Sequence, residues 1–111
     1  MKIIITSKGK EKDSLLDPRF GRCAFFYIYD SKKNKVKVKE NAAANVGGGA
    51  GIKAANFIIE EEADILITGN LGPNAQMVLK EAGIKVYTSE IKKINEVLKD
   101  YEEDKLELFD Y

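Results

Sequence analysis

Three short segments combine glycine with side chains that donate hydrogen bonds. They are residues 17–22 (DPRFGR), residues 45–51 (NVGGGAG) and residues 68–75 (TGNLGPNA). Glycine lets the backbone approach a ligand without interference from a Cβ atom, and successive N–H groups can then form an anion-binding nest. Arginine and asparagine side chains add further donors. The three segments therefore predict a binding site for an anion.

The residues predicted to contact this anion are of three kinds. The two arginines would neutralise its charge. The glycines would supply backbone N–H donors, or the turns that expose them, and two asparagines would make polar contacts. The set is Arg19, Arg22, Gly47, Gly48, Gly49, Gly69, Asn70, Gly72 and Asn74. The alternative interpretation is that the glycines only form turns and helix caps.

The glycine-rich stretch at residues 47–53 (GGGAGIK) matches neither common phosphate motif. It lacks the adjacent Gly-Lys-Ser/Thr of a P-loop, and it lacks the final glycine of G-x-G-x-x-G. A nucleotide is therefore not the first choice of anion.

Sulfur occurs at two positions that could bind a metal. Cys23 directly follows Arg22, and nearby arginines would lower the pKa of its thiol, so we consider it a candidate metal ligand. The alternative is a small buried hydrophobic residue at the start of a strand. One thiol cannot hold a conventional iron–sulfur cluster, which takes four ligands. We expect Met77 to lie in the core rather than to act as a soft ligand.

The composition excludes several kinds of site. The chain has 18 basic and 18 acidic side chains, one cysteine and no histidine. Zero net charge argues against a nucleic-acid partner, and without histidine a Ser-His or Cys-His nucleophile pair is impossible. One cysteine excludes an internal disulfide and a CxxC zinc site. We see neither a signal peptide nor a membrane-length apolar run, so we expect a cytoplasmic protein with no membrane partner.

The pattern of apolar residues predicts one α/β domain over residues 1–111. Five strands are expected, and helices are expected at residues 49–62, from Pro73 to a stop at Gly83, and after a cap at Ser89, with Ile91 on the inner stripe. The tail at residues 105–111 could be a short strand, a packed tail or a partner-binding tail. The expected strands are residues 2–6, 24–29, 35–39, 64–68 and 84–87.

The order of these elements predicts a ribonuclease-H-like mixed sheet with three helices on its faces. We expect the spatial order third, second, first, fourth, fifth strand. The lysine-rich strand at residues 35–39 then lies at an edge, where lysines resist pairing with other chains. The three glycine-containing segments meet at one end of the sheet, beside the point where the strand order reverses, and such points form ligand crevices.

The same three segments, followed by residues 82–87 (AGIKVY), resemble the dinitrogenase iron–molybdenum cofactor biosynthesis family of NifX-like domains. The resemblance covers about residues 3–98. It implies a ribonuclease-H-like fold and non-enzymatic binding, carriage or storage of an iron–sulfur or molybdenum-containing cluster or its precursor. It further implies a cluster that is held non-covalently and exchanged with donor or acceptor proteins. Some nitrogenase-associated members use histidine as a cluster ligand, and this chain has none.

Two other functions remain open at this point. A protein-interaction or scaffold domain, with the chain as a possible homo-oligomer, would use the tail at residues 105–111. A metal-dependent nuclease is disfavoured, because cleavage of that type needs several carboxylates around Mg²⁺. The first strand carries none, and only Asp17 lies in the three candidate segments.

Overall fold

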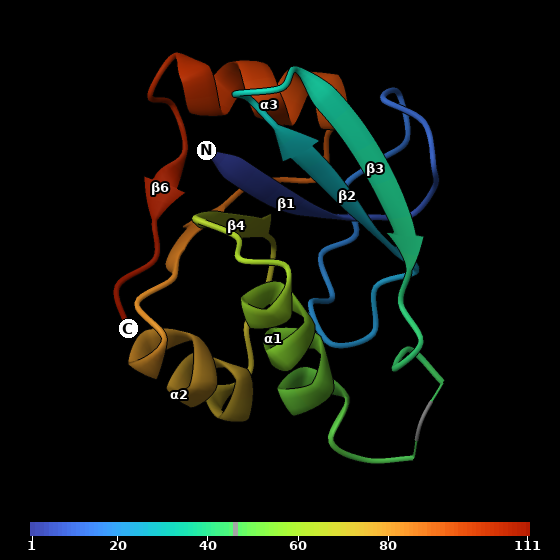
Figure 1. Ribbon diagram of the computed structural model, residues 1–111, viewed down its shortest axis with the longest axis vertical. Helices are drawn as coiled ribbons and strands as arrows, with labels where there is room; N and C mark the ends of the chain where they lie inside the picture. Colours follow the sequence, from blue (N-terminus) through green and yellow to red (C-terminus); the bar gives the residue numbers. More distant parts are fainter. Residues whose placement is uncertain (46) are drawn as a thin grey trace.

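The computed structural model describes residues 1–45 and 47–111; Val46, in the predicted small-residue loop, lies outside the described residues. Six strands and three helices are found in the described residues (Figure 1). In chain order they are β1 (Lys2–Ser7), β2 (Phe25–Asp30), β3 (Lys35–Glu40), α1 (Ala50–Glu60), β4 (Ile65–Thr68), α2 (Pro73–Glu81), β5 (Lys85–Thr88), α3 (Ile94–Glu102) and β6 (Glu107–Leu108). None of these helices is long and apolar enough to cross a membrane.

The strands form one mixed sheet in the order β3-β2-β1-β4-β5-β6. β1 pairs antiparallel with β2 and parallel with β4, and β4 pairs parallel with β5. The predicted order of the first five strands is confirmed. The tail adds a sixth strand, β6, antiparallel to β5, and Tyr111 then donates a hydrogen bond to the carbonyl of Ile84 at 2.7 Å.

The sheet lies between two helical layers, with α1 and α2 on one face and α3 on the other (Figure 1). Because successive strand residues point to opposite faces, the three isoleucines of β1 divide between two cores. Ile4 packs with residues of α1 and α2, whereas Ile3 and Ile5 pack with Ile94 and Val97 of α3. The first strand is therefore buried on both faces, as its apolar run predicts.

The start predicted for the last helix is wrong. α3 begins at Ile94, and the Ser89 hydroxyl donates to the Glu90 carbonyl instead of capping a helix. Ile91, expected on the inner stripe, is 51% exposed. The reason is tertiary: residues 92–95 pair through their backbone with the loop after β1. These hydrogen bonds hold residues 89–93 outside a helix.

Met77 is also misplaced by the sequence pattern, because its side chain is 71% exposed. The inner face of α2 is formed by Ala75 and Leu79, which are buried. Met77 lies two residues from each, and at about 100° per residue it must point away from the core.

Candidate functional site

The segment at residues 17–22 lies against both of the other glycine-containing segments. The Asn70 N–H donates to the Pro18 carbonyl at 2.7 Å, and a Cβ atom on Gly69 would stand 2.7 Å from Pro18 Cα. On the other side, a Cβ atom on Gly21 would stand 2.8 Å from the backbone nitrogen of Gly51. Approaches this close exclude a side chain at Gly21 and Gly69. The prediction that the three segments meet at one end of the sheet is confirmed.

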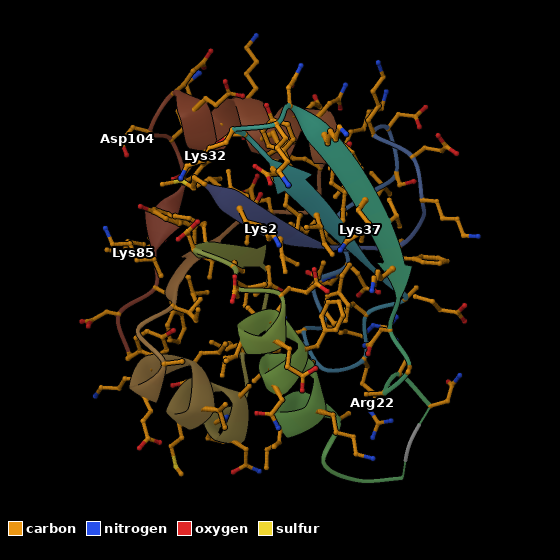
Figure 2. The ribbon with its side chains drawn as sticks, viewed as in Figure 1. Lys2, Arg22, Lys32, Lys37, Lys85 and Asp104 are labelled. Carbon is orange, nitrogen blue, oxygen red and sulfur yellow. The ribbon has the colours of Figure 1, made fainter. Side chains whose placement is uncertain are left out.

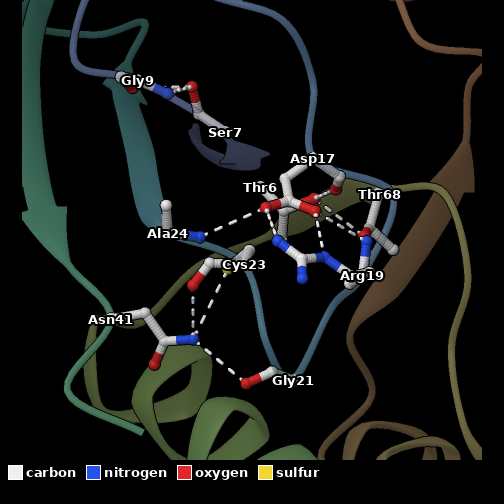
Figure 3. A network of polar contacts seen from close by, with 10 residues as sticks. All are labelled: Thr6, Ser7, Gly9, Asp17, Arg19, Gly21, Cys23, Ala24, Asn41 and Thr68. Carbon is white, nitrogen blue, oxygen red and sulfur yellow. Dashed lines mark hydrogen bonds and ion pairs between the residues drawn. The ribbon is translucent and has the colours of Figure 1, made fainter. Parts of the chain in front are cut away.

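Asp17, the first residue of this segment, holds it in place through its carboxylate (Figure 3). Its carboxylate is fully buried, and Arg19 donates to Oδ1 from its backbone N–H and Nε and to Oδ2 from Nη2, each at 3.1 Å. The Ala24 N–H also donates to Oδ2, at 3.3 Å. Burial by itself would raise the pKa of Asp17, but the bonds from Arg19 and Ala24 outweigh it and leave the pKa below its usual value. The carboxylate is therefore ionised at neutral pH.

Two threonines tie the same segment to the sheet. The Thr6 hydroxyl of β1 donates to the backbone carbonyl of Asp17 at 2.6 Å. The Thr68 hydroxyl of β4 lies 2.8 Å from that of Thr6. Since Thr6 gives its proton to Asp17, Thr68 is the donor between the two hydroxyls. Both hydroxyls lie in adjacent parallel strands, so the network fixes the segment at the point where the strand order reverses.

A hollow of about 280 Å³ opens between the N-termini of α1 and α2. Four of the predicted residues line it, namely Gly49, Asn70, Gly72 and Asn74. The remaining lining is formed by Phe20, Gly21, Ala50, Gly51, Ile52, Pro73 and Ala75. Gly51 and Ala75 face each other closely, since a Cβ atom on Gly51 would lie 3.6 Å from the Ala75 Cβ. Small residues thus bring the two helix N-termini together.

Both helices that bound this hollow start without a side-chain cap. α1 starts after Gly49, whose φ of 73° is the left-handed conformation that glycine adopts readily. Neither helix has an acidic residue in its first turn. The N–H groups of residues 50–52 and 74–75 therefore have no intrahelical acceptor, and each N-terminus carries roughly half a positive charge. This arrangement favours an anion in the hollow.

The two arginines line a second hollow of about 300 Å³. The guanidinium of Arg19 is bound to Asp17, although its side chain remains 64% exposed. Arg22 Nη1 donates to the Ala44 carbonyl at 3.0 Å, beside the loop that leads to α1 (Figure 2). Phe20 and Gly21 line the first hollow and stand in sequence between these arginines. The single predicted crevice is thus two hollows that share one segment.

The other three predicted glycines do not line either hollow. Gly47 and Gly48 are exposed in the loop before α1, with open space around the positions where Cβ atoms would stand. Gly69 lies against Pro18. Their place in the structure is that of turn residues and close-packed backbone.

The lowered thiol pKa predicted for Cys23 is wrong, and the alternative, a small buried residue just before a strand, is confirmed. The side chain is fully buried, and burial, together with the charge of Asp17, raises the pKa of the thiol to about 12. A hydrogen bond from the Asn41 amide at 3.6 Å and the charge of Arg19 oppose this shift without cancelling it. The thiol is therefore protonated at neutral pH. A role for Cys23 as a metal ligand stays a prediction.

Sequence reasoning missed Asn41 as a residue that shapes the site. Its Nδ2 donates to the carbonyls of Gly21 and Cys23 at 3.1 and 2.9 Å, and its Oδ1 accepts from the Ala43 N–H. Asn41 thereby joins the loop after β3 to the segment that carries the arginines. The available signal was an asparagine directly after a strand, where its side chain commonly forms an Asx turn.

The chemistry of the donors fits an anionic group better than a bare metal ion. In residues 1–45 and 47–111, no three or more Cys, Asp and Glu side chains gather so that they could hold a metal. The lining of the first hollow includes the first residues of α1 and α2, whose N–H groups have no intrahelical acceptor, and two asparagines, beside apolar residues such as Phe20 and Ile52. N–H groups donate hydrogen bonds and do not coordinate cations.

Comparison with known proteins places this geometry in context. The family described as dinitrogenase iron-molybdenum cofactor matches residues 1–104. An uncharacterized protein of Methanocaldococcus jannaschii is 38% identical over 98 residues, which cover 86% of this chain and 83% of that protein. The apo form of the orange protein from Desulfovibrio gigas superposes with a TM-score of 0.91, with 33% identity and coverage of 97% of this chain and 92% of the other. A putative NifB protein from Thermotoga gives 0.85, with 34% identity and coverage of 99% and 97%.

Proposed function

The chain belongs to the dinitrogenase iron–molybdenum cofactor family, and from this premise we propose that it binds an anionic iron–sulfur or molybdenum-containing cluster, or a precursor of one. It carries or stores this cargo without catalysing a reaction. The observation that carries the proposal is the convergence of two uncapped helix N-termini on one hollow. Sulfide and thiometallate groups are negatively charged acceptors, so they match the free N–H donors there.

Each part of the site has a defined role in this proposal. The N–H groups of residues 50–52 and 74–75 donate to the cargo, and the amides of Asn70 and Asn74 add polar contacts. The guanidiniums of Arg19 and Arg22 supply positive charge from the adjacent hollow. Because the main donors are backbone N–H groups at helix starts, they are already oriented before the cargo arrives. Non-covalent binding of this kind also allows transfer to acceptor proteins.

Cys23 is the single sulfur ligand that the cysteine content of the chain allows. Its Sγ lies beneath the segment at residues 17–22, buried and protonated. To bind a metal it would have to lose its proton and become exposed. The proposal therefore assigns the main binding to the N–H donors.

Anaerobic reconstitution with iron, sulfide and molybdate tests the proposed function. The decisive variant is Asn74→Asp, which places a carboxylate on the second residue of α2, at the edge of the first hollow. An acidic residue in the first turn stabilises a helix, so the fold is preserved while an anionic cargo is repelled. Asn95→Asp is the matched control, because Asn95 is the second residue of α3 and does not line the hollow.

We expect the wild-type protein and Asn95→Asp to elute with a coloured, metal-containing species. Asn74→Asp should retain at most about a tenth of the metal, as expected for a like charge placed beside the ligand. Equal metal content in the two variants, or no coloured species on the wild-type protein, would contradict the proposal.

A further inference from the structure

β3 forms one edge of the sheet and is paired only on one side, with β2. Its six residues alternate lysine and valine along most of its length, and five of them are exposed. The register places Val36 opposite Tyr29 and Val38 opposite Tyr27, on the face that α3 covers. The three lysines of the strand, at positions 35, 37 and 39, therefore share the opposite face, on the side of α1.

The lysine face of β3 carries more positive charge than its neighbours neutralise. Glu61, at the end of α1, is the acidic partner of Lys2, Lys37 and Lys39, whose Nζ atoms lie 3.9, 3.1 and 3.8 Å from its carboxylate oxygens. One carboxylate thus faces three ammonium groups, and the other acid on this face, Asp30 of β2, stands opposite Lys35 in the register. In residues 1–45 and 47–111, Lys35 makes no ion pair.

A groove of about 400 Å³ runs beside this row of lysines. Lys2 and Lys37, labelled in Figure 2, belong to its lining. On the opposite face of the strand Val36 is 49% exposed, so an apolar contact is available there too. The other lining residues are Ile28, Asp30, Lys33, Lys35 and Val36.

We propose that the outer edge of β3 binds an extended acidic segment of a partner protein, which adds a seventh strand to the sheet. Main-chain hydrogen bonds along an open edge give affinity, and the side chains at alternate positions give specificity. On the lysine face the segment carries Asp or Glu at every second position, opposite Lys35 and Lys37. On the other face it carries a small apolar residue beside Val36. Opposite charges directly across two strands are favourable pairs.

The lysines also define which strands are rejected. A second copy of the chain pairing through β3 would bring two lysine rows together, and like charges across strands are destabilising. A neutral strand would have to desolvate the ammonium groups without compensation. The lysines of β3 therefore attract acidic segments. The same positive charges prevent self-association through this edge and select an acidic partner.

This inference does not rest on the proposed function. Residues 35–38 line neither of the two hollows described above, and the experiment uses the protein without a cluster. Its failure would leave cluster binding untouched, and failure of cluster binding would leave this edge unchanged.

Titration with fluorescent peptides tests the proposal. An alternating Glu-Val peptide of eight residues is compared with the alternating Lys-Val peptide of the same length. We expect only the acidic peptide to bind, with an affinity that falls as salt is added. The variant Lys35→Glu/Lys37→Gln should weaken binding about tenfold or more. Lys12→Glu/Lys85→Gln makes the same charge change away from β3 and should bind like the wild type.

Two further peptides separate strand addition from simple charge attraction. Each has the Glu-Val sequence, with N-methyl groups on the odd residues in one and on the even residues in the other. A strand donates to its neighbour through alternate N–H groups, so one of the two peptides should lose binding. The proposal is overturned if both bind as well as the parent, if the acidic peptide does not bind at all, or if the two charge variants weaken binding equally.

Discussion

Two parts of the candidate site treat their hydrogen-bonding groups in opposite ways. We call the close-packed part around Asp17, with Pro18 and Gly69, the floor, and the starts of α1 and α2 that line the first hollow the rim. In the floor, the carboxylate of Asp17 accepts four hydrogen bonds and has no exposure to solvent. At the rim, α1 and α2 start after glycines with no side-chain cap and no acidic residue in the first turn. The same short segment at residues 17–22 belongs to both regions. The floor therefore stabilises the fold, whereas the rim keeps donors available for a ligand.

This contrast is informative because the third helix starts differently. α3 has Glu96 in its first turn, and the Lys93 N–H donates to the Glu96 carboxylate at 3.2 Å. Ser, Thr, Asp or Asn at the position before a helix stabilises it by about 1 kcal/mol relative to alanine but by only a few tenths relative to glycine, and α1 and α2 have glycine there. In residues 1–45 and 47–111, every buried side-chain nitrogen or oxygen has a hydrogen-bond partner. The starts of α1 and α2 leave their first N–H groups without a side-chain acceptor, and such groups are suited to bind an anion. Substitutions in the floor should thus change stability, and substitutions at the rim should change binding.

The largest effect on stability is expected from Asp17→Asn. The new amide must turn its NH₂ group toward donors, either Arg19 Nη2 and the Ala24 N–H or the Arg19 N–H and Nε. We expect a loss of about 3 kcal/mol in the free energy of unfolding, because buried donors lose a charged acceptor. Urea denaturation measures it. Asp13→Asn, at an exposed position in the loop after β1, is the control and should cost less than about 0.5 kcal/mol. If the two variants lose the same free energy of unfolding, Asp17 does not stabilise the floor as we propose.

A smaller effect on stability distinguishes two glycines three residues apart. Gly69→Ala places a methyl group 2.7 Å from Pro18 Cα, so the backbone must shift, at a cost of about 2 kcal/mol. Gly72→Ala meets nothing within 4 Å at the rim and should change the free energy of unfolding by less than about 0.5 kcal/mol. Thermal or urea unfolding of the two variants measures this difference in stability. If the two variants lose the same stability, the division between floor and rim does not hold.

The stability of the floor should also depend on pH. The pKa of Asp17 is lower in the folded state than its usual value, so its contribution is complete above the unfolded-state pKa of about 4 and is lost as the pH falls through the folded value. The stability difference between wild type and Asp17→Asn should therefore be constant from pH 5 to 7 and should shrink below pH 4. A difference that is independent of pH down to 2.5 would show that the charge of Asp17 does not matter.

The smallest effect on cluster loading is expected from Cys23→Ala. With a buried thiol whose pKa is raised to about 12, the folded protein should react with a thiol reagent at pH 8 only slowly, and quickly once unfolded. Cluster loading of Cys23→Ala should equal that of the wild type within error. A loss of loading would identify Cys23 as a ligand and would shift the site from the rim toward the floor.

The fold could be predicted from the sequence because its strands are marked by patterns that tertiary contacts reinforce. The isoleucines of β1, the lysine and valine alternation of β3, and the proline and glycine that bound α2 all act locally. Ser89 and Met77 were misassigned because the backbone pairing of residues 92–95 and the rotation of α2 are set by packing, which local patterns do not contain.

The site was predicted at the level of segments but not of individual contacts. Glycine-rich turns before helices indicate where N–H groups become free. Gly49, Gly72 and Asn74, predicted for one crevice, do line one hollow, and their contact with a ligand stays a prediction. The direction of each side chain was not predictable from the sequence. Arg19 turns back to Asp17 because a buried carboxylate needs a charged partner. Cys23 turns into the core, where its apolar side chain is buried, rather than toward the neighbouring Arg22.

The most direct test of the central claim is an NMR titration of ¹⁵N-labelled protein with tetrathiomolybdate under anaerobic conditions. We predict that the backbone N–H signals of residues 50–52 and 74–75 shift first and furthest, and that Asn74→Asp abolishes these shifts while Asn95→Asp leaves them intact. Shifts confined to other surfaces, or the same response from Asn74→Asp and wild type, would contradict the claim that the two uncapped helix N-termini bind an anionic metal–sulfur group.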